Sequence, residues 1–423
     1  MIGCGSTSSI ADGPTADIDA GADAAIDAPV VYDAAPASPD AGQTRCTVHN
    51  DDAQVAARGG FLEVCADPTT EPAAVCGDGS PYKWSYRPAP TGSSQGLLVF
   101  FQGGGACSDY VSCWGEDGKG GTGRTVTTMS NDRAGAQLDP TTHQSGGILD
   151  LGTTANALVD YDVVFSPYCT GDLGQTSREE VLVRPASADP SAPAQILTYF
   201  HGRDNLQLAV AFAERTFASP PHVVIAGSSA GGYVGLAATP MVVAAYPAPA
   251  TTFAYIGDAA AGIGLTSFDS SLDSIVSALD GTGTHRFARF VQFSFQADAT
   301  QRTFAKPAYQ PAAAFQAALQ TELEGRASRH PTNYRYFAPP GTCHVVLQSP
   351  ALYQKYVRAG DGTFVPASPP VMPNPDLTLD GVGLDAWLRA VVEGDGPFGA
   401  DVADLAGPWG TVLASCPLPT PVL

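Results

Sequence analysis

The sequence predicts an α/β fold in which helices cover both faces of a mostly parallel sheet. Short apolar runs recur along the chain, as expected of strands that are buried on both faces. Segments with helical spacing lie between them, so that strands and helices alternate. Glycine-rich or polar clusters follow several of the runs, where the strands of such sheets carry their functional residues. The expected strands cover residues 96–101, 161–167, 223–226, 252–257, 289–295 and 333–337, and the expected helices include 205–217, 312–324 and one within 376–394.

The N-terminal segment differs in composition from this fold. Residues 5–44 are mostly Ala, Asp, Pro, Ser, Thr and Gly, and their few bulky side chains cannot bury enough surface to offset the entropy cost of ordering. We expect residues 1–44 to form a disordered, acidic tether and residues 45–423 to form the folded domain. Residues 2–4 resemble the end of a bacterial lipobox, although no charged or apolar region precedes them. We expect Cys4 to be lipidated; the alternative is an ordinary cysteine in a disordered tail.

The overall charge restricts the possible partners. The 423 residues include 42 acidic and 21 basic ones, for a formal net charge of −21, which argues against nucleic acid and anionic lipid surfaces. No apolar run of about 20 residues is present to span a membrane. None of the nine cysteines forms a paired C-x-x-C motif, so no structural zinc is expected. The odd count in a chain that looks exported suggests four disulfides and one special cysteine, Cys4.

The strand expected at 223–226 leads into Gly227-Ser228-Ser229-Ala230-Gly231, which matches the G-x-S-x-G pattern of a nucleophile elbow. In that turn a strand passes sharply into a helix, and the glycines leave room for the two to cross. The N–H groups at the start of the helix then point toward the serine. An ordinary Gly/Ser turn also fits so short a pattern, so the choice between the two depends on the residues at the other strand ends. The strand-end clusters are Gly103-Gly104-Gly105, Ser229, Asp258, Asp298 and His344, which together favour an α/β-hydrolase fold.

A serine hydroxyl needs a base within hydrogen-bond reach and a third group that orients the base. In this fold class both follow the serine, the acid first and the histidine second. His344 follows the strand expected at 333–337 and a turn, which suits a loop above the elbow. His285 precedes its strand and His330 lies in a polar connection, so we assign the base to His344.

Two aspartates, Asp258 and Asp298, each follow a strand, and by position either could be the acid. We prefer Asp298, because the acid of this fold usually follows a strand later than the one directly after the elbow. Asp258 then has a structural or substrate-side role.

The oxyanion of an ester-cleaving site needs N–H donors aimed at the developing charge. Ala230 supplies one, and Gly103-Gly104-Gly105 resembles the glycine-rich oxyanion loop of esterases. A phosphate-binding loop is the alternative, but no Lys-Ser/Thr pair follows the glycines.

At these residues the chain resembles the pectin acetylesterase/Notum family of carboxylesterases. The similarity extends from about Cys76 to Cys416, and the motifs follow the family's order. Asp258, Asp298 and His344 fit its later strand ends. The matching segments are the cysteine-containing entry at 74–81, the glycine loop at 102–107, the Pro-Tyr-Cys segment at 165–172 and the nucleophile motif at 227–232.

The resemblance implies specific roles for residues of this chain. Ser229, Asp298 and His344 would be the catalytic triad, and Gly104, Gly105 and Ala230 the oxyanion donors. It also implies disulfides Cys107–Cys113 and Cys76–Cys169, which leaves Cys46–Cys65 and Cys343–Cys416 as the other pairs. An oxidising compartment fits all four bonds.

The chain departs from the family at three places. Ala106 stands where the family has a tryptophan, which removes an aromatic wall near the acyl site and bears on acyl-group preference. Gln102 replaces a glutamate before the glycines. Cys343-His344 shortens the family's Cys-x-x-His spacing beside the base.

The resemblance implies a serine carboxylesterase that forms an acyl-enzyme and removes acetyl groups from a polysaccharide, without metal or cofactor. Because Ala106 leaves room in the site, an esterase, lipase or polyester hydrolase for longer acyl groups is the alternative. A non-catalytic surface-binding protein on the same fold is a third hypothesis. We expect an exported monomer that binds an acylated glycan, and that is either secreted or attached to the cell envelope only by a lipid at Cys4.

Overall fold

The computed structural model describes residues 62–409, apart from gaps at 90–91, 120–123, 127, 131–146, 150–155, 264–265, 283–285, 348–355, 359–363, 367–377, 395, 399–401 and 408. The expected tether, Cys4, Cys46 and Cys416 therefore lie outside the described residues. In the described part of the chain, no helix is both long and apolar enough to cross a membrane.

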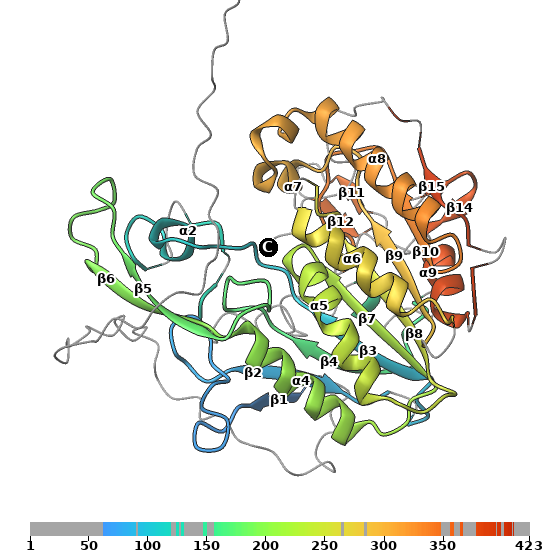
Figure 1. The fold of residues 1–423 in the computed structure, drawn as a ribbon, viewed down its shortest axis with the longest axis horizontal. Helices are drawn as coiled ribbons and strands as arrows, with labels where there is room; N and C mark the ends of the chain where they lie inside the picture. Colours follow the sequence, from blue (N-terminus) through green and yellow to red (C-terminus); the bar gives the residue numbers. More distant parts are fainter. Residues whose placement is uncertain are drawn as a thin grey trace, which may run out of the picture. The chain divides into compact units, whose positions relative to one another are not determined.

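The described strands form a mostly parallel sheet of nine, which confirms the predicted fold class (Figure 1). The order across it is β1-β2-β4-β3-β7-β8-β9-β10-β15. β1 and β2 pair antiparallel at one edge, and the strands from β4 to β15 run parallel. Their bounds are β1 Leu62–Cys65, β2 Lys83–Arg87, β3 Gly96–Phe101, β4 Tyr161–Ser166, β7 His222–Ser228, β8 Thr252–Asp258, β9 Ala288–Phe293, β10 Tyr334–Ala338 and β15 Leu405–Ala406.

Antiparallel ribbons outside this sheet account for the remaining described strands. β5 (Arg178–Val183) pairs with β6 (Gln195–Phe200). The two shorter ribbons are β11 (Tyr356–Arg358) with β12 (Phe364–Pro366), and β13 (Thr378–Leu379) with β14 (Val382–Gly383).

Helices cover both faces of the sheet, as the sequence predicts. Successive strand residues point to opposite faces, so Val99 packs into one buried cluster and its neighbours Leu98 and Phe100 into another. The first cluster includes side chains of α4, α5, α6 and α8, and the second includes side chains of α9. The described helices are α2 Tyr110–Trp114, η2 Gly147–Leu149, α4 Gly202–Thr216, α5 Ala230–Ala245, α6 Thr266–Ala278, α7 Ala299–Phe304, η3 Pro307–Tyr309, α8 Ala312–Arg329 and α9 Leu384–Glu393.

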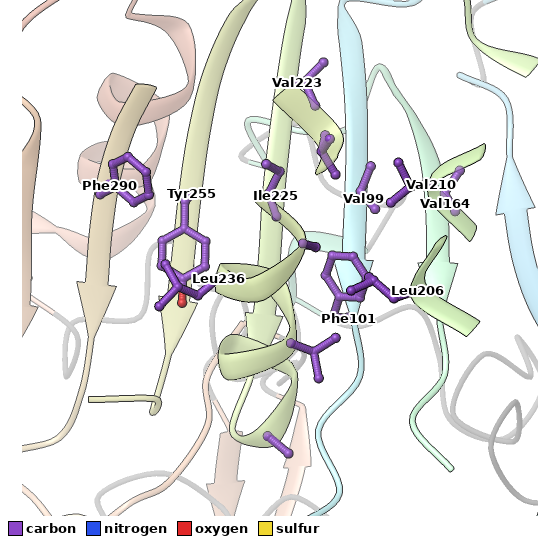
Figure 2. Close-up of a cluster of buried hydrophobic side chains, with 14 of the residues drawn as sticks. Val99, Phe101, Val164, Leu206, Val210, Val223, Ile225, Leu236, Tyr255 and Phe290 are labelled. Atoms are coloured by element: carbon purple, nitrogen blue, oxygen red, sulfur yellow. The ribbon is translucent and has the colours of Figure 1, made fainter. Parts of the chain in front are cut away.

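The core under α4 and α5 holds the strand that leads to the elbow. In Figure 2, Ile225 of β7 lies between the β3 side chain Val99 and Tyr255 of β8, and Leu236 of α5 packs above this layer. All four side chains are at most 2% exposed. Burial of one such side chain stabilises a fold by about 1.5–3 kcal/mol. The strand end that carries Ser229 is therefore fixed from both sides and from above.

Disulfides join the loops around this strand end. The structure has the expected Cys76–Cys169 and Cys107–Cys113 bonds. Cys65 and Cys343 are also disulfide-bonded. Their expected partners, Cys46 and Cys416, lie outside the described residues, so those two pairings stay predictions.

Candidate active site

The elbow places Ser229 between the end of β7 and the first residue of α5. Ser229 has φ 56° and ψ −125°, a backbone conformation that costs about 1–3 kcal/mol for a residue with a side chain. Glycines make the crossing possible. A Cβ at Gly227 would lie 2.1 Å from the carbonyl oxygen of Gly231, and one at Gly231 would lie 2.0 Å from the carbonyl oxygen of Phe101.

His344 lies between Ser229 and Asp298. Its Nε2 is 2.8 Å from the Oγ of Ser229, and its Nδ1 is 2.8 Å from the Oδ2 of Asp298. These contacts fit a neutral imidazole whose Nδ1–H donates to the carboxylate and whose Nε2 accepts from the hydroxyl. The three residues assigned from the sequence thus form one continuous chain of hydrogen bonds.

Backbone hydrogen bonds explain how His344 reaches the serine despite the short spacing after Cys343. The segment after β9 and the segment after β10 lie side by side. Gln296 and Ala297 donate their N–H groups to the carbonyls of Pro339 and Gly341, and Ala299 donates to Thr342. The loop that carries the histidine is therefore attached to the loop that carries Asp298.

Asp298 is fully buried and receives donors besides His344. It caps the N-terminus of α7, where its Oδ1 accepts the N–H of Gln301 at 2.8 Å. The side-chain amide of Gln301 donates to Oδ2 at 2.9 Å. Gln301 is not among the residues predicted for the site, although Asp-x-x-Gln is the spacing of an N-cap residue and the third helical residue.

Asp258 lies beneath the site. Its Oδ2 accepts hydrogen bonds at 2.8 Å from the Ser228 hydroxyl and from the N–H groups of Val346 and Leu347. It is 0% exposed and does not line the cavity beside Ser229. Of its two expected roles, this position fits the structural one.

Charges around the site change two pKa values in ways that matter for base catalysis. Burial lowers the pKa of His344, but the charge and hydrogen bond of Asp298 and the charge of Asp258 outweigh burial, so the pKa lies above its ordinary value. Burial raises the pKa of the Asp258 carboxyl to about 6, and its hydrogen bonds and the charge of His344 offset this only in part. His344 is accordingly a stronger base than an isolated histidine.

The glycine loop passes directly against the elbow. A Cβ at Gly103 would lie 2.4 Å from the carbonyl oxygen of Ser228 and 3.0 Å from the Cβ of Ser229. Gly105 has φ 80°, and a Cβ there would lie 1.9 Å from the carbonyl oxygen of Thr125. Only glycine fits at these positions, so the loop backbone comes close to the serine.

A cavity of about 230 Å³ opens beside the serine and histidine. Its wall is mostly apolar. Ala106 lies in this wall, and Phe304 is also in it with 47% of its surface exposed. The lining residues are Gly105, Ala106, Leu173, Ser229, Ala230, Tyr233, Ala259, Ile263, Gln301, Phe304, Ala305, Phe315 and His344.

Comparisons with known proteins find a family model that matches part of the chain and two solved structures of similar fold. A family model described as Pectinacetylesterase matches residues 63–270. Two crystal forms of the Wnt deacylase Notum from Drosophila are similar in structure, with 17% and 16% sequence identity and TM-scores of 0.46 and 0.47. The alignments cover 75% and 79% of this chain and 90% and 93% of those chains. No curated protein matches the chain in sequence.

Proposed function

We propose that the chain is a serine carboxylesterase that works through an acyl-enzyme, and the match of residues 63–270 to the pectinacetylesterase family model supports this. The observation that carries the proposal is the hydrogen-bond chain from Ser229 through His344 to Asp298, which lies at an apolar cavity. In such an arrangement the histidine can take the serine proton while the buried carboxylate stabilises the imidazolium.

The proposed reaction has two halves. His344 removes the proton from Ser229 as its Oγ attacks the ester carbonyl, and then gives that proton to the departing alcohol oxygen. Water next attacks the acyl-enzyme with the same histidine as base, which releases the carboxylic acid and free serine. The N–H groups of Ala230 and Gly105 are the proposed oxyanion donors because both residues line the cavity beside Ser229. Gly104, in the same loop, is the proposed third donor.

The proposed substrate is an acetyl ester on a polysaccharide, and the match to the pectinacetylesterase family model supports this. The net charge of −21 disfavours a strongly polyanionic glycan, because like charges reduce encounter. The chemistry needs no metal or cofactor. Export fits the two described disulfides, and a lipid anchor at Cys4 stays a proposal.

The cavity favours a second candidate, an esterase for longer acyl groups. The cavity of about 230 Å³ is several times the roughly 30 Å³ that one water molecule occupies in the liquid, so it has room for an acyl chain longer than acetyl. Among the described residues its wall includes Ile263, Phe304 and Phe315 but no Asp, Glu, Lys or Arg side chain. An acyl chain of several carbons would gain about 0.8 kcal/mol for each buried methylene there.

Two experiments separate these possibilities. A fluorophosphonate probe should label the wild-type protein and not the Ser229→Ala variant. Equal labelling of both contradicts the assignment of Ser229 as nucleophile, and no labelling of either favours the binding-protein alternative. A series of p-nitrophenyl esters of rising chain length, measured beside acetylated xylan, then ranks the substrates. A kcat/KM that rises steeply beyond the acetyl ester would replace the deacetylase proposal with the second candidate.

A further inference from the structure

Asp258 is a buried carboxylate that the proposed reaction does not use. It is the last residue of β8, and β8 pairs with β7, the strand that leads to Ser229. It is 0% exposed, and its Oδ1 has no hydrogen-bond partner among the described residues. An ionisable group in such surroundings destabilises the fold unless it is well bonded. Its presence beside the active site therefore calls for a physical reason.

The contacts of Asp258 reach both the nucleophile and the base. Its backbone carbonyl accepts the N–H of Ser229 at 2.7 Å. Its side-chain Oδ2 accepts the consecutive N–H groups of Val346 and Leu347, two and three residues after His344. One residue thus holds the backbone at the serine and the backbone just beyond the histidine.

We propose that Asp258 is a positioning residue that holds the His344 loop in register with Ser229. The inference rests on the proposed function. Two adjacent N–H donors on one carboxylate oxygen fix both the position and the direction of the loop backbone, and charge-assisted bonds of this kind are stronger than neutral ones. A displacement of a catalytic base by about 1 Å can reduce the rate roughly 100-fold.

The charge of Asp258 has a separate effect. The charged groups that face His344 are Asp298, from the loop after β9, and Asp258, from the end of β8; Asp258 in turn faces His344 and the hydroxyl of Ser228. Removal of the Asp258 charge should lower the pKa of His344, because one of two negative neighbours is lost. A residue with only a packing role would not change that pKa.

The test uses the full chain with p-nitrophenyl acetate as substrate. Asp258→Ala leaves three buried donors without an acceptor, and we expect kcat to fall roughly 10- to 100-fold with little change in KM, because Asp258 does not line the cavity. Asp258→Asn keeps an acceptor oxygen but no charge. It should retain most of kcat and move the acidic limb of the kcat/KM profile to lower pH.

Thr251→Val is the matched control. Thr251 is also buried, lies just before β8 at the opposite end from the site, and donates to the carbonyl of Pro220. We expect this variant to lose stability while kcat and the acidic limb stay as in the wild type. In the wild-type protein, hydrogen exchange should be slow at the amides of Val346 and Leu347. If the Asp258 variants do not fold, this measurement on the wild type takes their place as the test.

The possible failures are distinguishable. If the wild type hydrolyses the ester but Asp258→Asn and Asp258→Ala keep its kcat and its acidic limb, the inference is wrong and the esterase proposal stands. Rapid exchange at Val346 and Leu347 in the wild type, or equal losses of kcat in Thr251→Val, would also overturn it. A wild type that neither hydrolyses the ester nor reacts with fluorophosphonate would overturn both.

Discussion

Gln301 offers the sharpest test of how the acid of the site is held. Its side-chain amide donates to Asp298 Oδ2 and to the Ser294 hydroxyl, both at 2.9 Å, and its carbonyl oxygen accepts the N–H of Ala261 at 3.0 Å. Gln301→Met preserves the approximate shape and removes all three bonds. The backbone N–H of residue 301 still reaches Asp298 Oδ1, so the helix cap itself is retained.

The expected magnitude follows from those bonds. A hydrogen bond to a charged group contributes about 1.5–3 kcal/mol, and a buried donor left unpaired, here the N–H of Ala261, costs about 1–3 kcal/mol. We expect the free energy of unfolding to fall by about 3–5 kcal/mol. Since Asp298 loses one of its fixed donors, we expect kcat/KM to fall about tenfold, which corresponds to about 1.4 kcal/mol of transition-state stabilisation.

The assay pairs urea unfolding with p-nitrophenyl ester hydrolysis. Gln316→Met is the control, because Gln316 is also buried but donates to Gln296, and neither of these residues lines the cavity. It should lower stability without changing kcat/KM of the folded protein. If Gln301→Met retains wild-type kcat/KM, or if Gln316→Met loses as much activity, then the glutamine does not position Asp298.

Three further outcomes are expected. In the wild type, kcat/KM should decrease as the pH is lowered and His344 gains a proton, and because the pKa of His344 is raised, this decrease should begin at a higher pH than for an ordinary histidine. Asp298→Asn should shift this acidic limb to lower pH and reduce kcat roughly 10⁴-fold, and an unmoved limb would contradict the assignment of Asp298. Gly231→Ala places a Cβ 2.0 Å from the Phe101 carbonyl oxygen, so thermal unfolding should show a large loss of stability, and a wild-type melting temperature would refute the geometry of the elbow. Ala106→Trp should fill the cavity wall and shift the p-nitrophenyl ester preference toward acetyl, whereas an unchanged ranking would remove Ala106 from the acyl site.

Much of the fold could be predicted because its strands are buried on both faces. Such strands, β7 among them, leave continuous apolar runs that are visible in the sequence. The β5–β6 ribbon leaves no such run, since its strands mix exposed and buried residues and Val183 is 63% exposed. The edge strand β1 and the two-residue β15 are too short to give a pattern of their own.

Part of the site could likewise be predicted from the sequence, and part could not. Ser229 lies in a local motif, and His344 and Asp298 follow strands, so position along the chain suffices to suggest them. Gln301 acts by contacts to Ala261 and Ser294 that exist only after α7 folds against the loop beyond β8. The two consecutive amides that bind Asp258 belong to backbone, which carries no residue-type signal at all.

The six-residue helix α7 has one consequence for how this protein could diversify. Its N-terminal end is fixed by Asp298, while its C-terminal end presents Phe304 and Ala305 to the cavity. Substitutions at the far end can reshape the acyl wall without disturbing the carboxylate that orients the histidine. The residues that hold the triad and the residues that shape the cavity therefore lie at opposite ends of one short helix. Substitutions at Phe304 and Ala305 can change the ester preference while Asp298 stays in place.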